Sequence, residues 1–351
     1  MDKATIRVGL VGFGYASQTF HAPLINSTPG LSIGAVSSRD PARVHAALGP
    51  DTAVCPDAAA LVVRDDIDLV VIASPNATHA DLARRALAAG KHVVVDKPFT
   101  LDAREAAALA AMAAPEQLLS VFHNRRWDSS TLSAAAMLAS GRLGTLRHAA
   151  LHFDRFRPLP RERWREDGSA GGGIWLDLGP HLIDEALQYF GPPLAIQADI
   201  TALRPGARAD DGFLARLRYA DGLRVDLGAS MLAAVPRARV VLHGLLGSYM
   251  KQGLDPQEGA LKTGLLPQEG TRWGADPEDG VFAFEQDGAP RTQALPSLDG
   301  DYPAYYRGVR DAILGKGPNP VTPQQALTVM RLLDAGRRST DERREVLLDD
   351  A

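Results

Sequence analysis

The chain has 351 residues, of which 45% are hydrophobic and 23% charged, with a formal net charge of −4. This length predicts two domains, and the small negative charge argues against nucleic-acid binding, which needs clustered basic residues. No apolar run reaches the roughly 20 residues that span a bilayer, and the strand-like run after Met1 leaves no room for a signal peptide. The single cysteine, Cys55, favours a reducing compartment and lacks the Cys/His neighbours that a zinc site needs. We therefore expect a soluble cytoplasmic protein with no metal site, no membrane segment and no nucleic-acid partner.

Short β-branched runs alternate with alanine-rich helical stretches over the first third of the chain. The predicted strands are Ile6–Val11, Leu31–Val36, Leu69–Ala73, His92–Val95 and Leu118–Phe122. The predicted helices are Pro41–Leu48, Ala77–Ala89 and Leu101–Ala114. This alternation predicts a doubly wound parallel sheet with helices on both faces, in an α/β domain over residues 1–122.

A glycine-rich turn follows the first predicted strand. Gly12 and Gly14 permit a tight turn and let backbone N–H groups approach a pyrophosphate, while Ser17 stands where the third glycine of the fingerprint is usual. Because the turn follows the first strand of a βαβ pattern, it predicts dinucleotide binding rather than an ordinary turn. The candidate cofactor residues here are Gly12, Phe13, Gly14, Tyr15 and Ala16.

The second strand leads into Ser37, Ser38 and Arg39 instead of the acid that holds a ribose 2′-hydroxyl. Two hydroxyls and a guanidinium suit a 2′-phosphate, so NADP is favoured, with NAD as the alternative. Asp40 and Pro41 are expected to begin the next helix as its N-cap and first residue. The competing interpretation is that Arg39 is only a surface residue at a helix start.

Two later strand ends reach the same expected ligand crevice. The first supplies Ser74, Pro75, Asn76 and His79 as candidates for the cofactor wall, although a packing or capping role suits His79 better than catalysis. The second reads VVVDKP over residues 93–98, a buried strand that stops abruptly at proline and projects Lys97 into the crevice. Taken alone, Lys97 is equally well explained as a solvated loop residue.

A dense polar and aromatic cluster, residues 123–128, follows the strand Leu118–Phe122 and forms either an interdomain clamp or a substrate wall. A helix is expected over Ser130–Ser140 and a strand over Leu146–Phe156, followed by an arginine-rich segment and the flexible Gly168–Gly173. Pro180 is then expected in the first turn of a helix, with Asp177 just before it and His181 in that turn. The imidazole could accept a proton near neutral pH, or could merely cap its own helix.

The rest of the chain predicts an α+β domain over residues 123–351, built on an open, mainly antiparallel sheet. The predicted strands are Ala195–Leu203, Phe213–Tyr219, Leu223–Leu232 and Arg239–Gly244. Leu245–Gly280 is expected to be loop with one short helix, and Tyr302–Leu314 and Pro323–Arg338 are two closing helices that could pack on the first domain. The open face of such a sheet needs cover, which predicts a homodimer or homotetramer.

Together the motifs GFGYAS, SPNATH, DKPF and DLGPH resemble those of the Gfo/Idh/MocA family of nicotinamide-dependent sugar and polyol oxidoreductases. Within this family, the chain most resembles the branch that contains NADP-dependent scyllo-inositol dehydrogenase. This resemblance lies in the motifs FHAPL (residues 20–24), HNRRWD (residues 123–128) and RWRE (residues 163–166). The resemblance covers essentially the whole chain and implies a dinucleotide-binding Rossmann domain followed by a substrate domain.

The resemblance also assigns roles to residues. It implies that Lys97, Asp177 and His181 are catalytic, and that Lys97 lies in a cofactor-binding motif with Asp96 and Pro98, in which the Lys97–Pro98 peptide is cis. Asp96 departs from the family's glutamate, which puts the contacts of that acid in doubt. The candidate substrate residues are Asn124, Arg125, Trp127, Trp164, Asp177 and His181.

A hypothesis follows for the reaction, in which a polyol or sugar hydroxyl is oxidised. His181 takes the hydroxyl proton, Lys97 donates a hydrogen bond to the developing alkoxide, and Asp177 binds a neighbouring hydroxyl or orients the imidazole. Two alternatives are a non-catalytic NADP-binding sensor and a glycoside-cleaving enzyme that holds NAD tightly. The intact catalytic positions weigh against the first alternative, and the Ser37–Arg39 segment weighs against the second.

Overall fold

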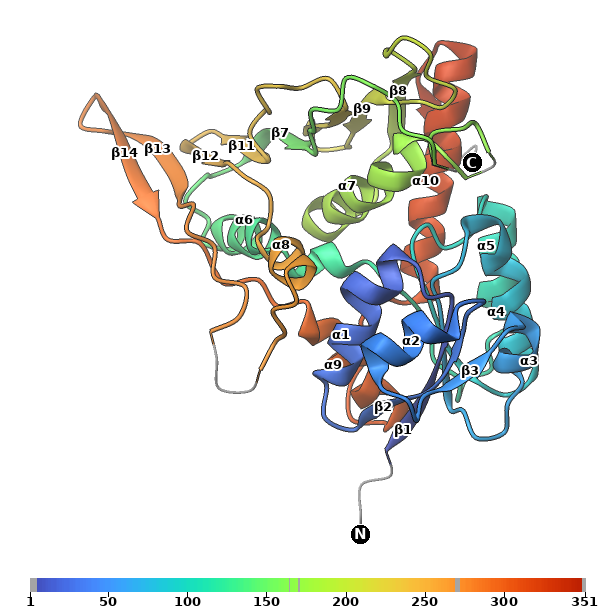
Figure 1. The fold of residues 1–351 in the computed structure, drawn as a ribbon. Helices are drawn as coiled ribbons and strands as arrows, with labels where there is room; N and C mark the ends of the chain where they lie inside the picture. Colours follow the sequence, from blue (N-terminus) through green and yellow to red (C-terminus); the bar gives the residue numbers. More distant parts are fainter. Residues whose placement is uncertain (1–4, 164, 170, 269–271, 349–351) are drawn as a thin grey trace. The chain divides into compact units, whose positions relative to one another are not determined.

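The computed structural model describes residues 5–163, 165–169, 171–268 and 272–348, and the chain divides into two compact units (Figure 1). The first unit comprises Met1–Asn124, Gln257–Trp273 and Asp301–Leu327. The second comprises Arg125–Pro256, Gly274–Gly300 and Thr328–Ala351. Each unit therefore draws on segments that are distant in sequence. Of the helices in the described residues, none is long and apolar enough to cross a membrane.

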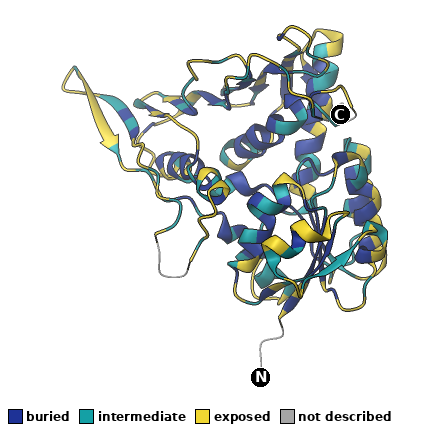
Figure 2. Ribbon diagram, in the orientation of Figure 1, coloured by how far each residue is buried: buried dark blue, intermediate teal, exposed yellow. Residues whose placement is uncertain are grey.

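The first unit is built on a six-stranded sheet in the order β3-β2-β1-β4-β5-β6, and all its strands are parallel. Its strands are β1 (Ile6–Val11), β2 (Leu31–Ser37), β3 (Ala53–Cys55), β4 (Leu69–Ile72), β5 (His92–Val95) and β6 (Leu119–Val121). The central strands are almost entirely buried, as their dark colour in Figure 2 shows. The doubly wound sheet is thus confirmed, with the short edge strand β3 added. The strand order reverses between β1 and β4, which is where ligands bind in such sheets.

The first unit also contains several helices and helical turns. They are η1 (Ser17–His21, a π-helical turn), α1 (Ala22–Asn26), α2 (Pro41–Leu48), α3 (Ala58–Val62), η2 (Asn76–Thr78, a 3₁₀ turn), α4 (His79–Ala88), α5 (Ala103–Met112), α8 (Gln257–Lys262) and α9 (Pro303–Ile313). Asp40 caps α2 as expected, because its Oδ1 accepts the Arg43 N–H at 3.0 Å. Thr322 likewise caps α10 (Pro323–Glu342), which begins in the first unit and continues in the second.

The second unit contains a nine-stranded sheet in the order β14-β13-β12-β11-β7-β10-β9-β8-β15. Its strands are β7 (Leu146–His152), β8 (Ala195–Thr201), β9 (Gly212–Arg218), β10 (Arg224–Ser230), β11 (Val240–Gly244), β12 (Gly247–Lys251), β13 (Gly280–Gln286), β14 (Ala289–Leu295) and β15 (Val346–Leu347). Only β10 and β7 pair in parallel, so the expected mainly antiparallel sheet is confirmed. The helices α6 (Ser129–Ala139) and α7 (Ile174–Phe190) pack on one of its faces.

Two expectations for this sheet are wrong. The segment Leu245–Gly280 holds the expected short helix, α8, but it also contains strand β12. β12 begins at Gly247, where a Cβ would approach the Phe282 ring to 2.7 Å, and this glycine obscures the apolar alternation of a strand. The strand predicted over Leu146–Phe156 ends at His152, and Phe156 forms only an isolated bridge with Leu232.

The start of α7 is the third correction. The helix begins at Ile174 rather than near Pro180, so Pro180 lies inside it and Asp177, not His181, lies in the first turn. The cause is Asp210, whose backbone oxygen accepts the Ile174 N–H at 2.9 Å and whose Oδ2 accepts the Trp175 N–H at 2.7 Å. Because this acid supplies the N-terminal cap from a distant loop, the helix needs no cap in its own sequence. Asp177 and His181 consequently stand four residues apart on one helix face.

Replacing Asp210 by alanine should therefore destabilise the protein. The change removes the cap of α7 and the 2.9 Å bond from Arg337 to Asp210 Oδ1, at a cost of about 1–3 kcal/mol in the free energy of unfolding. Urea unfolding followed by circular dichroism measures this difference. Asp199→Ala, at an exposed position on β8, is the control and should have little effect. Equal stabilities of the two variants would contradict the capping role.

Candidate active site

The glycine turn after β1 has the shape that a bound pyrophosphate requires. Gly12 has a φ of +86°, and a Cβ there would lie 2.9 Å from the carbonyl oxygen of Ala73, so only glycine fits. Around Gly14 an added Cβ would meet no atom within 4 Å, which leaves space for a ligand against the backbone. Ser17, in the third fingerprint position, is buried, and its hydroxyl donates to the Gly12 carbonyl at 2.6 Å. Phe13 is buried, and the neighbouring Tyr15 and Ala16 open the first helical turn.

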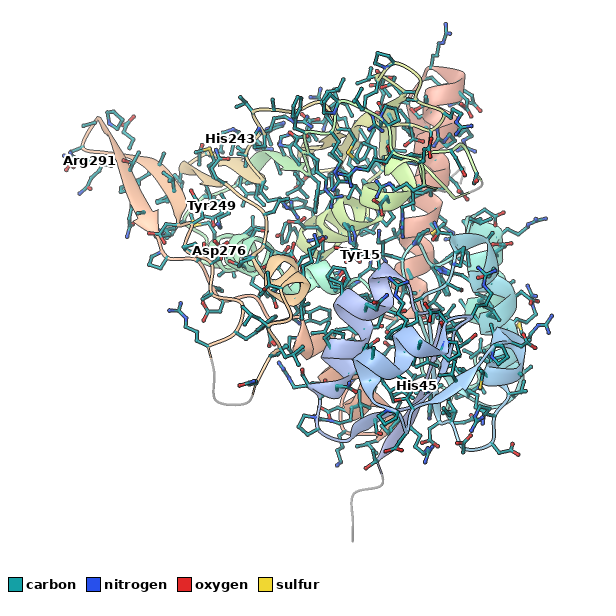
Figure 3. The ribbon with its side chains drawn as sticks, in the orientation of Figure 1. Tyr15, His45, His243, Tyr249, Asp276 and Arg291 are labelled. Atoms are coloured by element: carbon teal, nitrogen blue, oxygen red, sulfur yellow. The ribbon has the colours of Figure 1, made fainter. Side chains whose placement is uncertain are left out.

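Two residues that the sequence did not indicate, Glu258 and Lys262, also lie at this turn. The Tyr15 hydroxyl donates to Glu258 Oε1 at 2.8 Å, and Lys262 pairs with the same carboxylate at 2.6 Å. Burial, and next the Glu258 charge, raise the pKa of Tyr15 against the opposing effect of Lys262. Both partners lie on α8, which thus borders the cofactor turn within the first unit; Figure 3 labels Tyr15.

The residues after β2 form an ordered turn that ends in an exposed arginine. Ser37 is buried, and Ser38 Oγ accepts the Asp40 N–H at 3.1 Å, which fixes the turn. The Arg39 side chain is exposed and forms no ion pair with any residue that the structure describes. A charged side chain at the end of a central strand, without an acid to neutralise it, is suited to bind the 2′-phosphate of a dinucleotide.

His79 connects the ends of β4 and β5. Its ring nitrogens lie 3.0 Å from the Ser74 carbonyl oxygen and 2.9 Å from the Pro98 carbonyl oxygen. Burial lowers the pKa of this histidine, while the charge of Asp96 opposes the shift. His79 therefore holds the two loops together, which agrees with the expected packing role. In the loop after β4, the hydroxyl of Ser74 also hydrogen-bonds to the hydroxyl of Thr78 at 2.6 Å. Pro75 in the same loop is exposed, and Asn76 is buried.

Asp96 is buried at the end of β5 and has a defined environment. Its Oδ1 accepts the backbone N–H of Lys97 at 2.8 Å, and its Oδ2 lies 3.8 Å from His21 Nε2. Burial raises the pKa of Asp96, but His21, Lys97 and His79 outweigh burial and hold it below the ordinary value of 3.8. His21 is fixed in turn through its Nδ1, which lies 2.7 Å from the Tyr306 hydroxyl on α9.

Lys97 follows directly, half-buried, and its peptide bond to Pro98 is cis, as the resemblance implied. Asn124 is buried just after β6. The predicted residues of the first unit therefore all come from the carboxyl ends of β1, β2, β4, β5 and β6. These ends share one edge of the parallel sheet.

The second unit holds the other predicted residues. Arg125 is buried, lies over the Phe153 ring at 4.6 Å and contacts Asp128 at 3.3 Å. Trp127 is half-buried in the 3₁₀ turn η3 (Asn124–Trp127). The adjacent Arg126 forms a two-pronged ion pair with Asp184 of α7, with distances of 2.9 and 2.6 Å. This pair anchors the polar cluster to the helix that carries Asp177 and His181.

Asp177 and His181 lie on successive turns of α7. His181 is buried, and Asp177 Oδ1 lies 3.7 Å from Arg165 Nε. Trp164, the remaining predicted residue, lies outside the described residues. The structure thus groups Asp177 and His181 on one helix of the second unit, whereas Lys97 belongs to the first unit.

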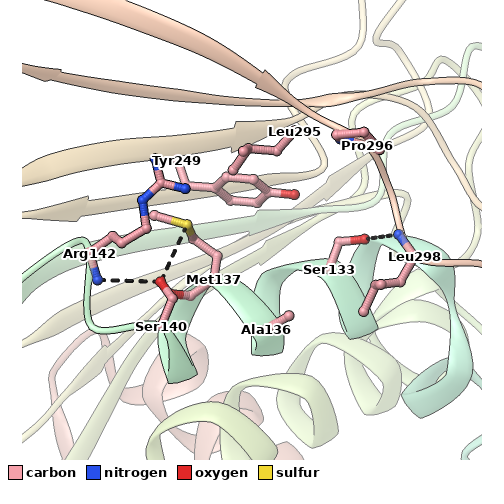
Figure 4. Close-up of a pocket in the computed structure, with 9 residues that line it drawn as sticks. All are labelled: Ser133, Ala136, Met137, Ser140, Arg142, Tyr249, Leu295, Pro296 and Leu298. Atoms are coloured by element: carbon pink, nitrogen blue, oxygen red, sulfur yellow. Dashed lines mark hydrogen bonds between the residues drawn. The ribbon is translucent and has the colours of Figure 1, made fainter.

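A small pocket also lies in the second unit, between α6 and the β12–β14 side of the sheet (Figure 4). Its volume is about 180 Å³, and Tyr249, Met137 and Leu298 line it. Two of its polar side chains are already engaged: Ser133 Oγ accepts the Leu298 N–H at 2.9 Å, and Arg142 donates to Gln293 at 2.6 Å. Nothing in this pocket requires a ligand. Among the described residues, no group of His, Cys, Asp or Glu could hold a metal ion.

Two family models match the chain. The oxidoreductase family with an NAD-binding Rossmann fold, Gfo/Idh/MocA, matches residues 6–123, and the Gfo/Idh/MocA C-terminal domain matches residues 131–250. Together they cover most of both units.

Known proteins show the same similarity over their whole length. The chain is 49% identical over 345 residues to the uncharacterized oxidoreductase YdgJ of Escherichia coli, covering 98% of this chain and 99% of YdgJ. It is 33% identical over 349 residues to scyllo-inositol 2-dehydrogenase (NADP(+)) IolW of Bacillus subtilis, covering 98% and 96%. Among solved structures, YPO2259 of Yersinia pestis, described as an oxidoreductase, has a TM-score of 0.92 at 50% identity, with 98% of this chain and 97% of that chain covered.

The buried carboxylate of Asp96 predicts a pH dependence of stability. Since its folded pKa lies below the ordinary 3.8, the ionised form stabilises the protein above that pH, and this contribution is lost as the pH falls through the lower folded value. Asp96→Asn should cost about 1–3 kcal/mol near neutral pH, with a difference from the wild type that shrinks below pH 3.8. Urea titrations across the pH range measure it. Asp51→Asn, an exposed control, should show no such trend, and a pH-independent effect of Asp96→Asn would contradict the prediction.

Proposed function

Because the chain belongs to the Gfo/Idh/MocA family of oxidoreductases, we propose that it transfers a hydride between NADP(H) and a secondary alcohol or ketone of an inositol-like polyol or a sugar. The observation that carries this proposal is the edge of the parallel sheet, where the glycine turn and Lys97 follow strands β1 and β5. The inositol part of the proposal is supported by the names of two relatives, IolW and the inositol 2-dehydrogenase of Rhizobium meliloti, which is 28% identical.

NADP is the proposed cofactor. The space at Gly14 and the glycine-only conformation of Gly12 fit a pyrophosphate, and the exposed Arg39 fits a 2′-phosphate. The relative IolW is NADP-dependent, which supports the same choice. When bound, NADP supplies the acceptor of the hydride, and the chain's own residues bind, orient and exchange the proton.

The proposed roles of the site residues follow from their chemistry. His181 takes the proton of the substrate hydroxyl, because an imidazole accepts protons near neutral pH. Lys97 donates a hydrogen bond to the oxygen as negative charge develops there. Asp177 binds a neighbouring hydroxyl or orients the imidazole. Asn124, Arg125 and Trp127 form part of the substrate wall, and Trp164 is proposed for the same wall from sequence alone.

The proposal includes self-association through the open face of the second sheet, as a homodimer or homotetramer in the cytoplasm. On the face opposite the helices, Val241 pairs with Met250, and Met250 pairs with Val281. Met250 and Leu214 are exposed on this face although both are large and apolar. A second copy of the chain would remove them from water.

Lys97→Ala and His181→Ala should each lower kcat/KM by about 100-fold or more, as expected for groups that act on the transferred proton and the developing charge. Absorbance of the reduced nicotinamide reports turnover across a panel of inositol isomers and aldoses. Lys316→Ala, an exposed lysine of the first unit, is the control and should match the wild type. Turnover within a few-fold of the wild type in both active-site variants would overturn the assignment.

Arg39→Gln should raise the KM for NADP by about 10- to 100-fold while leaving the KM for NAD nearly unchanged, since only NADP carries the 2′-phosphate. Arg104→Gln removes an exposed arginine from α5 in the same unit and should change neither constant. Equal effects of Arg39→Gln on both cofactors would remove the argument for NADP.

A further inference from the structure

A strongly basic loop follows β7 in the second unit and is not used by the proposed mechanism. Within residues 155–165 the chain places five arginines, namely Arg155, Arg157, Arg161, Arg163 and Arg165. We call residues 155–163 together with Arg165 the arginine loop. Glu162 is the only acid in this loop, and it is exposed. Such a density of one charge is unusual in a chain with a net charge of −4.

The arginine loop is held in a defined conformation. Buried Arg204 donates from its Nη1 to the carbonyl oxygens of Arg157 and Leu159, at 3.0 and 3.1 Å. Arg204 is itself neutralised by Asp211 at 2.8 Å and Glu166 at 2.9 Å. The anchoring cation is therefore already paired, and it orders the backbone of the loop without competing for an anion.

The charge of the loop itself is only partly neutralised. Arg163 pairs with Glu166 at 2.6 Å, but Arg157 forms no ion pair with any described residue, and its Nη1 is buried without a hydrogen-bond partner. Burial, and then the charges of Arg155, Arg161 and Arg163, lower the pKa of Arg157. A guanidinium remains charged despite such a shift, and Arg157 is only half-buried, so an anion at its accessible side would supply the ion pair that the described residues do not.

The loop also leads directly to the helix that carries Asp177 and His181. The carbonyl oxygen of Arg165 accepts the N–H of Gly173, the residue before α7, at 2.8 Å. Arg165 Nε lies 3.7 Å from Asp177 Oδ1 in the first turn of that helix. The Arg165 end of the arginine loop therefore lies beside the first turn of α7.

We propose that the arginine loop binds an anionic group of the substrate, a carboxylate or a phosphate, with Arg157 as its principal ligand. The substrate is thus a sugar acid or a phosphorylated polyol or sugar rather than a neutral one. The planar guanidinium matches both kinds of anion with two parallel hydrogen bonds. This inference rests on the proposed function for the reacting alcohol, but the anion site is testable by binding alone.

The kinetic test compares neutral substrates with their anionic counterparts, with NADP as cofactor. The set is glucose, glucuronate and glucose 6-phosphate, together with myo-inositol and its monophosphate. For one kind of anion, the wild type should have a kcat/KM at least about 10-fold higher than for the neutral counterpart. Comparing the carboxylate with the phosphate substrates shows which anion it is. Arg157→Gln should raise the KM for that anion by about 10- to 100-fold with a smaller change in kcat, and the wild-type KM should rise with salt.

Two further variants complete the test. Arg291→Gln, on β14, removes an exposed arginine of the same unit and should behave as the wild type (Figure 3). Arg161→Gln, at an exposed position of the loop, should weaken anion binding in the same direction but less, and it gives the result if Arg157→Gln does not fold. If Arg157→Gln raises the KM for NADP instead of that for the substrate, the loop binds the cofactor's phosphate and the inference is overturned.

Calorimetric titration of the protein with glucuronate and with inorganic phosphate separates this inference from the proposed function. The wild type should bind one of these anions at least about 10-fold more tightly than Arg157→Gln, or than Arg161→Gln if Arg157→Gln does not fold. If that difference is found but no substrate turns over, the anion site stands and the proposed function fails. Turnover of neutral substrates in preference to anionic ones, with equal anion binding by all folded proteins, overturns the anion site and leaves the proposed function intact.

Discussion

One buried carboxylate constrains the cofactor side of the first unit. Asp96 ends β5 where water is largely excluded, so its charge must be compensated within the protein. The Lys97 N–H, His21 and His79 provide this compensation, and His21 is fixed by Tyr306 of α9. The position of the loop that carries Lys97 thus depends on helices from both ends of the chain. The side chain, one methylene shorter than a glutamate, accepts the adjacent backbone N–H and leaves His21 Nε2 at 3.8 Å.

Most of the sheet in the first unit could be predicted because the signals for it are local. β1, β4 and β5 are runs of buried β-branched residues, and Asp40 and Thr322 cap helices whose first residue is proline. The start of α7 could not be predicted, because its cap is Asp210, 35 residues beyond Trp175. A helix that takes its cap from a distant loop carries no start signal of its own, and its internal proline suggested the wrong boundary.

The candidate site shows the same division between local and distant information. Strand ends identified Lys97, Arg39 and the glycine turn, because the carboxyl ends of parallel strands meet at one edge. Glu258 and Lys262 could not be identified in this way, since Glu258 reaches Tyr15 across 243 residues of sequence. Sequence reasoning placed His181 in a first helical turn, where it could accept a proton or merely cap the helix. The structure instead places it, buried, a full turn inside α7, where a capping role no longer accounts for it.

Net charge and local charge lead to different conclusions about ligands. A total of −4 argues against a large polyanionic partner, yet it says nothing about a loop in which five arginines lie within eleven residues. The Debye length at 0.1 M salt is about 10 Å, and salt screens charges farther away than this from a bound molecule. IolW is named for scyllo-inositol, a neutral polyol, and is 33% identical to this chain. At 33% identity two members of one family can share the reacting alcohol and differ in the rest of the substrate. In our proposal the sheet edge and α7 act on the alcohol, and the arginine loop selects the charge.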